Sequence, residues 1–236
     1  MATDCNTVTG LQRLTILLED NHLLAVLKRP GLPTMGVAAG KASLLSLAKE
    51  HIKRRYRKPG NVYLGVVSRI DEPVSGVVLF ARTSKAAARL SEQFRSRSVE
   101  KAYWAIVERR PEPPNGEWTD YIVKDERRRR MIRVERHAPG AQEARLAYRV
   151  VQPAAQDWLV EINPETGRKH QIRLQLSSHG YPIHGDRKYG SRREFPLGIA
   201  LHARRLAFDH PVSNKRIELT APVPESWRRW GIRSTA

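Results

Sequence analysis

Two apolar runs rich in valine flank a short polar insert in the first third of the chain. Residues 62–67 and 76–81 each have the composition of a buried strand, and Arg69 and Asp71 stand between them. Because a short loop held by two core strands is stiff, it can keep a carboxylate in one geometry. The pattern therefore predicts two strands joined by a loop that carries a polar site.

The charge of the chain indicates the kind of partner it binds. Its 236 residues include 42 Lys and Arg against 24 Asp and Glu, a formal net charge of +18. Such an excess repels itself in a compact state, and phosphate backbones are the commonest polyanions that neutralise it. Hydrophobic residues make up 40% of the chain, which is enough for a folded core. Nucleic acid is the expected partner, and a generally solvated basic surface is the alternative.

Several classes of protein are excluded by what the sequence lacks. Cys5 is the single cysteine, so an intrachain disulfide and a cysteine-based zinc site are both excluded. No apolar run approaches the roughly 18 residues of a membrane span, and residues 1–10 lack the apolar centre of a secretory signal. We expect no metal site, because the histidines show no metal-binding spacing, and we expect the cytoplasm as the compartment.

The hydrophobic periodicity predicts an α+β protein with a largely antiparallel, mixed sheet. Further strands are expected at 14–18, 23–27, 101–107, 146–151, 158–162, 199–203, 206–208 and 217–221, and helices at 43–54, 84–96 and 166–180. Residues 124–136, which include four consecutive arginines, are expected to form a charged hairpin or loop.

Asp71 allows two interpretations when it is considered with its neighbours alone. Aspartate is common in turns, and Glu72 and Pro73 follow it, so a turn residue is the simpler interpretation. A catalytic carboxylate is the other. Asp71 and Glu72 do not form a glycosidase-like pair, because adjacent side chains of an extended segment point to opposite sides.

Three longer motifs stand in order along the chain. The first is Ser-Arg-Ile-Asp-Glu-Pro-Val-Ser-Gly at 68–76, and the second is Lys-Ala-Tyr-Trp-Ala at 101–105. The third is Thr-Gly-Arg-Lys-His-Gln-Ile-Arg at 166–173, followed by Gly-Tyr-Pro-Ile-His-Gly-Asp at 180–186 and by Tyr-Gly at 189–190. With weaker matches at 16–31 and 201–211, these segments resemble the RluA family of RNA pseudouridine synthases. The matches run from about residue 14 to residue 224.

This resemblance implies the pseudouridine synthase catalytic fold, with an active-site cleft across its sheet. It also implies that uridine in structured RNA, either rRNA or tRNA, is isomerised to pseudouridine. The C1′–N1 bond breaks, the uracil rotates and C5 bonds to C1′, so no cofactor is required. We expect a flexible tail over residues 1–11, one catalytic domain over 12–236 without a separate N-terminal RNA-binding domain, and a monomer.

The resemblance also implies roles for single residues. Asp71 is the catalytic carboxylate, Arg173 pairs with it and keeps it ionised, and Tyr103 stacks on the freed uracil. Arg69 fills the space that the flipped base leaves. Ile183 is expected either as an apolar wall against the ring or as a core residue. The other expected substrate-binding residues are Arg168, His170 and Gln171.

Some positions depart from the family pattern. Ser68 replaces the histidine before Arg, Val74 replaces a threonine, and Arg29 separates the usual Lys-Pro pair. The change at Ser68 is expected to alter RNA contacts rather than the chemistry. The basic segments 53–58, 127–130 and 192–193 are expected to grip RNA. A non-catalytic RNA-binding or assembly protein on the same fold, and a general basic nucleic-acid binder, are the two alternatives.

Overall fold

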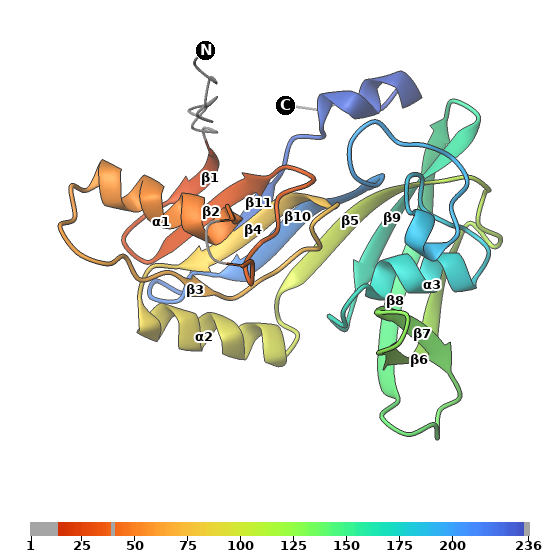
Figure 1. Ribbon diagram of the computed structural model, residues 1–236, viewed down its shortest axis with the longest axis horizontal. Helices are drawn as coiled ribbons and strands as arrows, with labels where there is room; N and C mark the ends of the chain where they lie inside the picture. Colours follow the sequence, from red (N-terminus) through yellow and green to blue (C-terminus); the bar gives the residue numbers. More distant parts are fainter. Residues whose placement is uncertain (1–13, 39–40, 234–236) are drawn as a thin grey trace, which may run out of the picture.

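One mixed sheet of eleven strands runs through the part of the chain that the structure describes (Figure 1). The computed structural model describes residues 14–38 and 41–233, so the tail expected over residues 1–11 lies outside it. The strands are β1 (Thr15–Glu19), β2 (Leu23–Lys28), β3 (Gly65–Val66), β4 (Ser75–Ala81), β5 (Glu100–Val107), β6 (Asn115–Asp125), β7 (Arg130–Val134), β8 (Gln142–Ala154), β9 (Asp157–Pro164), β10 (Leu201–Asp209) and β11 (Arg216–Thr220). Their main order is β1-β2-β4-β10-β5-β9-β8-β6-β7.

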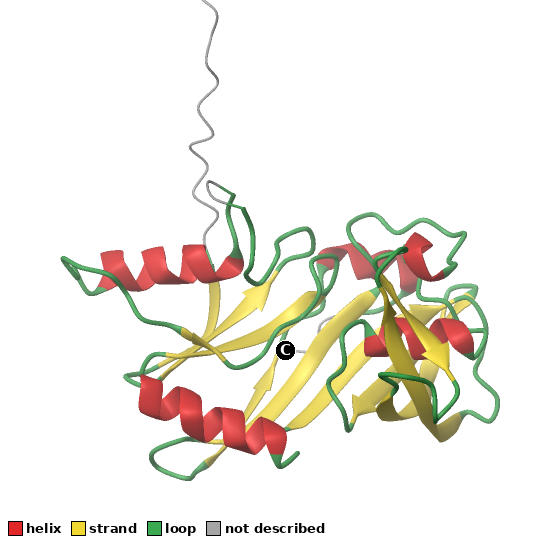
Figure 2. Ribbon diagram, turned by 60° about the horizontal axis from the view of Figure 1, so that its bottom comes forward, coloured by secondary structure: helices red, strands yellow, loops and turns green. Residues whose placement is uncertain are grey.

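Helices cover both faces of the sheet around β2 and β4 (Figure 2). On one face, Leu24 and Phe80 belong to the same core cluster as α1 (Leu44–Arg55). On the other face, Leu23 and Leu79 belong to the cluster that includes α2 (Ser84–Arg95). Because successive residues of a strand point to opposite faces, a strand covered on both sides must be apolar throughout. This double burial explains the unbroken valine-rich run of β4.

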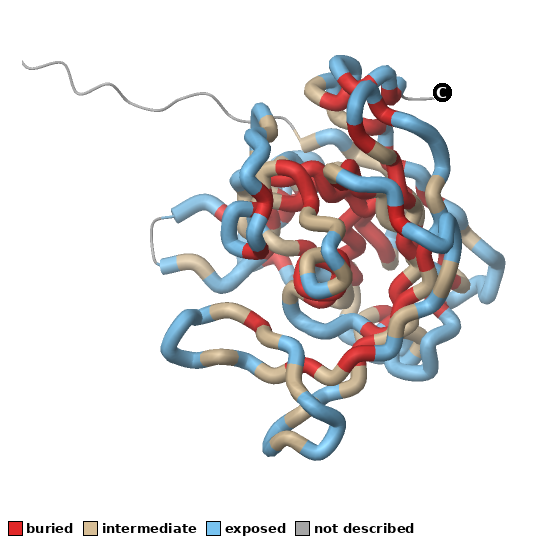
Figure 3. Tube along the Cα trace, turned by 90° about the vertical axis from the view of Figure 1, so that its right-hand side faces the viewer, coloured by how far each residue is buried: buried red, intermediate tan, exposed pale blue. Residues whose placement is uncertain are grey.

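The other end of the sheet is built round a long hairpin. Strands β6 and β7 pair from Tyr121–Val134 to Asp125–Arg130, and β8 joins this hairpin to β9. Helix α3 (Gln171–Ser178) packs on this part of the sheet through Leu174, which contacts the same small core cluster as Met131. Figure 3 shows the buried segments of the fold gathered within exposed loops.

Two short helices complete the described structure. They are η1 (Arg187–Tyr189), which follows α3, and η2 (Glu225–Trp230), near the end of the chain. Trp227 of η2 is 1% exposed, so the last part of the chain is anchored in the main core. Within the described residues, no helix is long and apolar enough to cross a membrane.

The two halves of the sheet meet where β4 lies parallel to β10. Ser75 is opposite His202 and Gly76 is opposite Ala203, and this is the sole parallel pairing within the described sheet. The Ser75 hydroxyl lies 2.8 Å from Nδ1 of His202, and both residues are buried. Gly76 has φ +125°, and a Cβ there would lie 2.3 Å from the carbonyl oxygen of Ala203. A glycine is therefore required at this junction.

The expected α+β class and the largely antiparallel, mixed sheet are confirmed. The strand expected over 62–67 is wrong in length, since β3 keeps only Gly65–Val66. The physical reason is that β2 occupies one edge of β4, while β10 occupies the start of the other edge. On that other edge β3 pairs with Phe80 and Ala81, and its pairing ends at Leu79, whose amide donates to the Ser68 side chain instead of to a strand backbone.

Three further boundaries differ from the sequence expectations. The strand β6 was not expected, and residues 124–136 form the end of its hairpin with β7. The two short strands expected at 199–203 and 206–208 are one strand, β10, with a bulge between Ala203 and Arg205. The helix expected from Thr166 begins only at Gln171. A bulge keeps a strand continuous while a buried arginine interrupts its apolar pattern.

Replacement of Gly76 by alanine is expected to lower the free energy of unfolding by about 3 kcal/mol, because the backbone of Ala203 cannot yield to a Cβ. Urea unfolding of the variant measures this loss. Gly60→Ala is the matched control, because Gly60 is exposed and a Cβ there meets nothing within 4 Å. Equal stability of the two variants would contradict the close approach of β4 and β10.

His202 is expected to make stability depend on pH. Burial, with a contribution from the Arg204 charge, lowers the pKa of His202 to about 4, although its hydrogen bond to Ala221 acts in the opposite direction. An unfolded histidine has a pKa of about 6.5, so the unfolded chain binds more protons between these values. The stabilisation from neutral His202 should be complete above about pH 6.5 and should decline as the pH falls toward 4.

Urea unfolding between pH 4 and pH 7 would measure this decline. Histidine side-chain NMR should show the His202 ring neutral down to the lower end of that window, with its signal assigned from a His202→Gln variant. A His202 ring that gains its proton near the ordinary histidine value would contradict the prediction.

Candidate active site

The loop that carries Asp71 is fastened to the sheet by backbone contacts on several sides. Ser68 accepts a hydrogen bond from the Leu79 amide of β4 at 2.9 Å, which fixes the start of the loop. The Thr34 hydroxyl donates to the Ile70 carbonyl at 2.9 Å. Further along, the Ile199 amide donates to the Pro73 carbonyl at 3.1 Å. The expected stiff polar loop between two strands is thus present.

A buried ammonium group, that of Lys28, also holds the loop that carries Asp71. Lys28 is fully buried, and its Nζ donates to the carbonyls of Leu32 at 2.7 Å and Glu72 at 2.9 Å. Burial lowers the pKa of Lys28 to about 8, although the charges of Asp71 and Glu72 act in the opposite direction. Lys28 therefore joins the loop after β2 to the residue next to Asp71, a role that sequence motifs alone did not reveal.

Arg173 stands between two carboxylates. Its Nη1 lies 2.9 Å from Oδ2 of Asp71, as the sequence resemblance implied. Its Nε and Nη2 donate to Oδ2 and Oδ1 of Asp186 at 2.6 and 2.8 Å. Burial alone would lower the pKa of Arg173, but hydrogen bonds and charges from Asp186 and Asp71 raise it above its ordinary value. Arg173 is buried rather than a surface cation, so it aims a fixed charge at Asp71.

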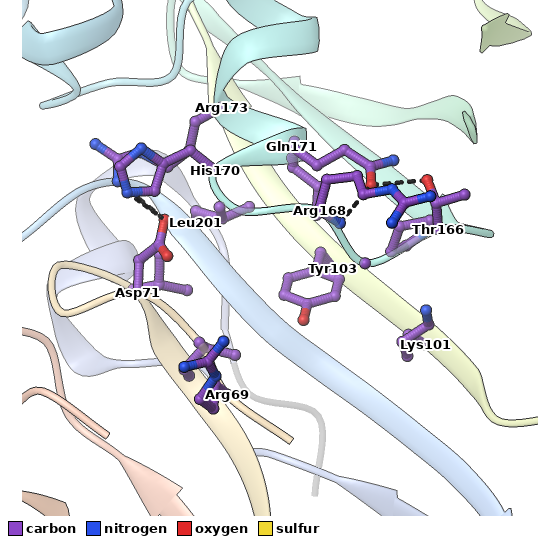
Figure 4. Close-up of a pocket in the computed structure, with 15 residues that line it drawn as sticks. Arg69, Asp71, Lys101, Tyr103, Thr166, Arg168, His170, Gln171, Arg173 and Leu201 are labelled. Carbon is purple, nitrogen blue, oxygen red and sulfur yellow. Dashed lines mark hydrogen bonds and ion pairs between the residues drawn. The ribbon is translucent and has the colours of Figure 1, made fainter. Parts of the chain in front are cut away.

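The Asp71–Arg173 pair opens into a hollow beside Tyr103 (Figure 4). This inner hollow has a volume of about 110 Å³ and continues into a groove of about 740 Å³. Tyr103 lines both, and β5 supplies it at the level where β10 and β9 pair on either side. Burial raises the pKa of Tyr103 to about 12, with a contribution from the negative charge of Asp71. The tyrosine is therefore a neutral phenol at ordinary pH.

Two cations face the same space. Arg69 is exposed and lines both the hollow and the groove, which fits the residue expected to enter the space of a flipped base. Lys101, two residues before Tyr103 on β5, lines both as well. Burial and the nearby charge of Arg97 lower the pKa of Lys101. The sequence motifs indicated no role for Lys101, although its spacing from Tyr103 places both side chains on one face of a strand.

The segment before α3 brings the remaining candidates to the hollow, in different ways. His170 lies beside Asp71, with 3.7 Å between its Nε2 and Oδ2 of Asp71. Arg168 lines both the inner hollow and the groove, and its Nε donates to the Glu143 carbonyl at 3.0 Å. Gln171 also lines the inner hollow. These three residues are thus brought together with Asp71, as expected.

The side chain of Gln171 is occupied by protein partners. Its Oε1 accepts from the Thr166 hydroxyl at 2.8 Å and from the Arg168 amide at 3.0 Å, and its Nε2 donates to the Arg145 carbonyl. The loop from Thr166 to Arg168 folds round this amide, which explains why α3 begins later than expected. Gln171 therefore shapes the wall of the hollow.

Ile183 is not brought to the hollow. It is 1% exposed and forms an isolated β-bridge with Val107, within the main core. Apolar walls come instead from Ile70, Val74 and Leu201. Ile183 was expected either as an apolar wall against the uracil ring or as a core residue, and the structure places it in the core. The bridge to the end of β5 explains the difference, because backbone pairing draws the side chain inward.

The described part of the chain holds no group of three or more His, Cys, Asp or Glu side chains that could bind a metal ion. The polar side chains that line the inner hollow include one carboxylate, several cations and a phenol. Such a set suits an anionic, aromatic ligand such as a nucleotide, because the cations can contact phosphate and the tyrosine face can stack on a base.

A stiff loop with an arginine-paired aspartate, set in a basic groove across a mixed sheet, is the arrangement that the sequence resemblance implied. A family model described as RNA pseudouridylate synthase matches residues 22–178. The chain is 33% identical to ribosomal large subunit pseudouridine synthase C of Vibrio vulnificus, over 95% of this chain and 70% of that protein. It is 32% identical to ribosomal large subunit pseudouridine synthase D of Zymomonas mobilis, over 90% of this chain and 70% of that protein.

The chain therefore belongs to the RluA family of RNA pseudouridine synthases, and it is an isomerase that acts on uridine in RNA. A solved structure agrees with this assignment. Human RNA pseudouridylate synthase domain containing 4 has a TM-score of 0.77 and 27% identity, and the match covers 92% of this chain and 93% of that one. The comparisons favour the enzyme over both binding-protein alternatives.

Replacing Asp186 by asparagine is expected to lower the free energy of unfolding by about 3 kcal/mol, because it removes a buried counter-charge from Arg173. Turnover should fall as well, because Arg173 loses the contact that aims it at Asp71. Urea unfolding and a pseudouridine assay on the same preparation measure both effects.

Glu194→Gln is the matched control. It breaks a pair with Arg187 in which both side chains are more than 70% exposed, so it should change stability by less than about 0.5 kcal/mol. An Asp186→Asn variant as stable and as active as this control would show that Asp186 does not hold Arg173.

Proposed function

We propose that this chain isomerises uridine in large-subunit ribosomal RNA, with Asp71 as the catalytic carboxylate. The observation that carries the proposal is the Asp71 carboxylate, which lines a basic groove, lies 2.9 Å from Arg173 and faces the same hollow as Tyr103. The names of the relatives, ribosomal large subunit pseudouridine synthase C and D, support ribosomal RNA as the substrate rather than tRNA.

The proposed reaction requires one carboxylate that acts at the sugar. Asp71 attacks C1′, or stabilises positive charge there, while the C1′–N1 bond breaks. The uracil then turns, and C5 bonds to C1′. The proton that leaves C5 is balanced by the proton that N1 gains, so the isomerisation needs neither an oxidant nor a reductant.

Tyr103 is assigned to holding the freed uracil. Because burial and Asp71 raise its pKa to about 12, Tyr103 enters the reaction as a neutral phenol. A neutral phenol can donate a hydrogen bond and offers an aromatic face, but it is a poor acceptor of the C5 proton. Stacking and hydrogen-bond donation are therefore its proposed contributions.

The groove outside the hollow is proposed to bind the RNA backbone. Its lining includes Lys124, Lys169 and Arg205 in addition to Arg69 and Lys101. Phosphate contacts position a nucleic acid without reading its sequence, which suits cations that surround a single reactive pocket. Arg69, exposed at the mouth of the hollow, is proposed to occupy the space left by the flipped base.

Among the three basic segments, 127–130 has the strongest support as an RNA contact. It lies at the turn of the β6–β7 hairpin, and Lys124 beside it lines the groove. Segments 53–58 and 192–193 are proposed to contact more distant parts of the RNA. We further propose that the protein acts as a monomer in the cytoplasm.

An Asp71→Asn variant is expected to lose activity by about a thousandfold or more, because the amide carries no charge to act at C1′. Purified protein is incubated with transcribed ribosomal RNA, and pseudouridine is mapped by carbodiimide modification and primer extension. Glu72→Gln is the matched control, because Glu72 is the exposed neighbouring carboxylate and should be dispensable. Wild-type turnover by Asp71→Asn would remove Asp71 from the reaction.

The same mapping identifies the substrate. Deleting the gene in its native host should remove one or more pseudouridines from large-subunit ribosomal RNA, and expression of the wild-type chain should restore them. Loss confined to tRNA would keep the isomerase activity but overturn the proposed ribosomal substrate.

A further inference from the structure

Tyr189 lies behind the Asp71–Arg173 pair, and neither the motifs nor the proposed mechanism gives it a task. It is 5% exposed, and its ring lies 5.1 Å from the Arg173 guanidinium. Its hydroxyl has two partners: the backbone nitrogen of Met131 at 3.0 Å and Nδ1 of His170 at 2.8 Å. One side chain thus contacts strand β7, the residue before α3 and the cation that pairs with Asp71.

The direction of these hydrogen bonds follows from the Met131 amide. A backbone N–H can only donate, so the Tyr189 oxygen accepts from Met131. Within the described residues, Nδ1 of His170 is the one remaining partner of this hydroxyl, so the phenol proton is satisfied by pointing to Nδ1. The proton of a neutral His170 ring is then on Nε2. That nitrogen lies 3.7 Å from Oδ2 of Asp71 (Figure 4). Tyr189 therefore selects the form of His170 that presents a donor to Asp71.

The charges round His170 favour this neutral form. Burial lowers the pKa of His170 to about 4. The negative charge of Asp71 acts against this shift, whereas the positive charges of Arg173, Lys188 and Lys169 add to it. The ring is therefore a neutral hydrogen-bond donor over the pH range in which RNA is handled.

The backbone of His170 is also fixed. Its φ is +53° and its ψ is +20°, a left-handed conformation that is uncommon for residues other than glycine, although asparagine, aspartate and histidine adopt it more often than the rest. Such strain persists where the surroundings over-determine the position, and it gathers at functional sites. His170 makes no side-chain cap bond to α3, so helix capping does not account for it.

The contacts of Tyr189 and its neighbour Lys188 also reach the β6–β7 hairpin, whose turn carries the basic segment 127–130. Met131 is the second residue of β7, directly after segment 127–130. Lys188, the neighbour of Tyr189, donates from Nζ to the Arg129 carbonyl at 2.7 Å. Two consecutive residues of η1 therefore hold the hairpin at the turn proposed to bind RNA, and one of them contacts His170.

We propose that Tyr189 and His170 are positioning residues that couple the β6–β7 hairpin to the Asp71 carboxylate. Tyr189 holds His170 with its Nε2 facing Oδ2 at 3.7 Å, and Arg173 donates a hydrogen bond to the same oxygen. In residues 14–38 and 41–233, no hydrogen bond or ion pair reaches Oδ1, so that oxygen is left for the sugar carbon. The proposal rests on the catalytic role proposed for Asp71.

Two variants of His170 separate this role from a merely structural one. His170→Gln can place an amide N–H near the position of Nε2, whereas His170→Asn cannot, although asparagine accepts the left-handed backbone more readily. Single-turnover rates are measured with saturating enzyme, and the dissociation constant for RNA is measured separately. We expect His170→Asn to lose rate about thirtyfold and His170→Gln to recover most of it, with RNA binding changed less than about twofold.

Tyr189→Phe tests the other half of the link. It removes only the hydroxyl, so it should lower the single-turnover rate about tenfold with RNA binding nearly unchanged. A rate equal to wild type would overturn the proposal, and so would a His170→Asn variant as fast as His170→Gln. If both His170 variants fail to fold, Tyr189→Phe decides alone, because it keeps the ring.

Asp71→Asn distinguishes failure of this link from failure of the proposed function. Wild-type turnover by Asp71→Asn removes the catalytic carboxylate itself. An inactive Asp71→Asn together with wild-type rates for the Tyr189 and His170 variants removes only the positioning link.

Discussion

The Arg173 guanidinium is buried, and its need for counter-charges organises the site. A buried cation is stable only with well-placed anionic partners, and here they come from two loops far apart in the sequence. Asp186 grips two nitrogens of the guanidinium, which leaves Nη1 directed at Asp71. The loop before β4, helix α3 and the segment before η1 must therefore come together for the cation to be buried. The geometry of the reactive carboxylate is a consequence of this requirement.

Much of the fold and the central pair could be predicted from the sequence, because both are marked by local patterns. The apolar run of β4 follows from its burial on both faces, and the resemblance of the motif around Arg173 to the RluA family implied its pairing with Asp71. The late start of α3 could not be predicted, because it depends on how Gln171 is hydrogen-bonded to a loop and to β8. Contacts between distant segments leave no periodicity in the sequence.

The residues that were missed or misplaced have the same explanation. Lys28 and Tyr189 owe their positions to partners more than forty residues away, Glu72 and Met131. Ile183 stands in a motif near Asp186, but a backbone bridge to β5 turns it into the core. The strand β6 was missed because polar residues stand on both of its faces, with Asp120 on the buried one, so its apolar alternation is weak. In each case the position of the residue depends on tertiary contacts, which the local sequence does not show.

The position of β10 has a consequence for how the chain folds. This strand lies between β4 and β5 at the centre of the sheet, yet it begins at residue 201 of 236. During synthesis the early strands therefore emerge long before the neighbour that joins them, and the loop to be closed is long. Nascent chains shorter than this point expose the edges of β4 and β5, which are apolar and open to wrong pairing. The enzyme can acquire its active site only after β10 has been synthesised, so a chain that ends before Leu201 is inactive.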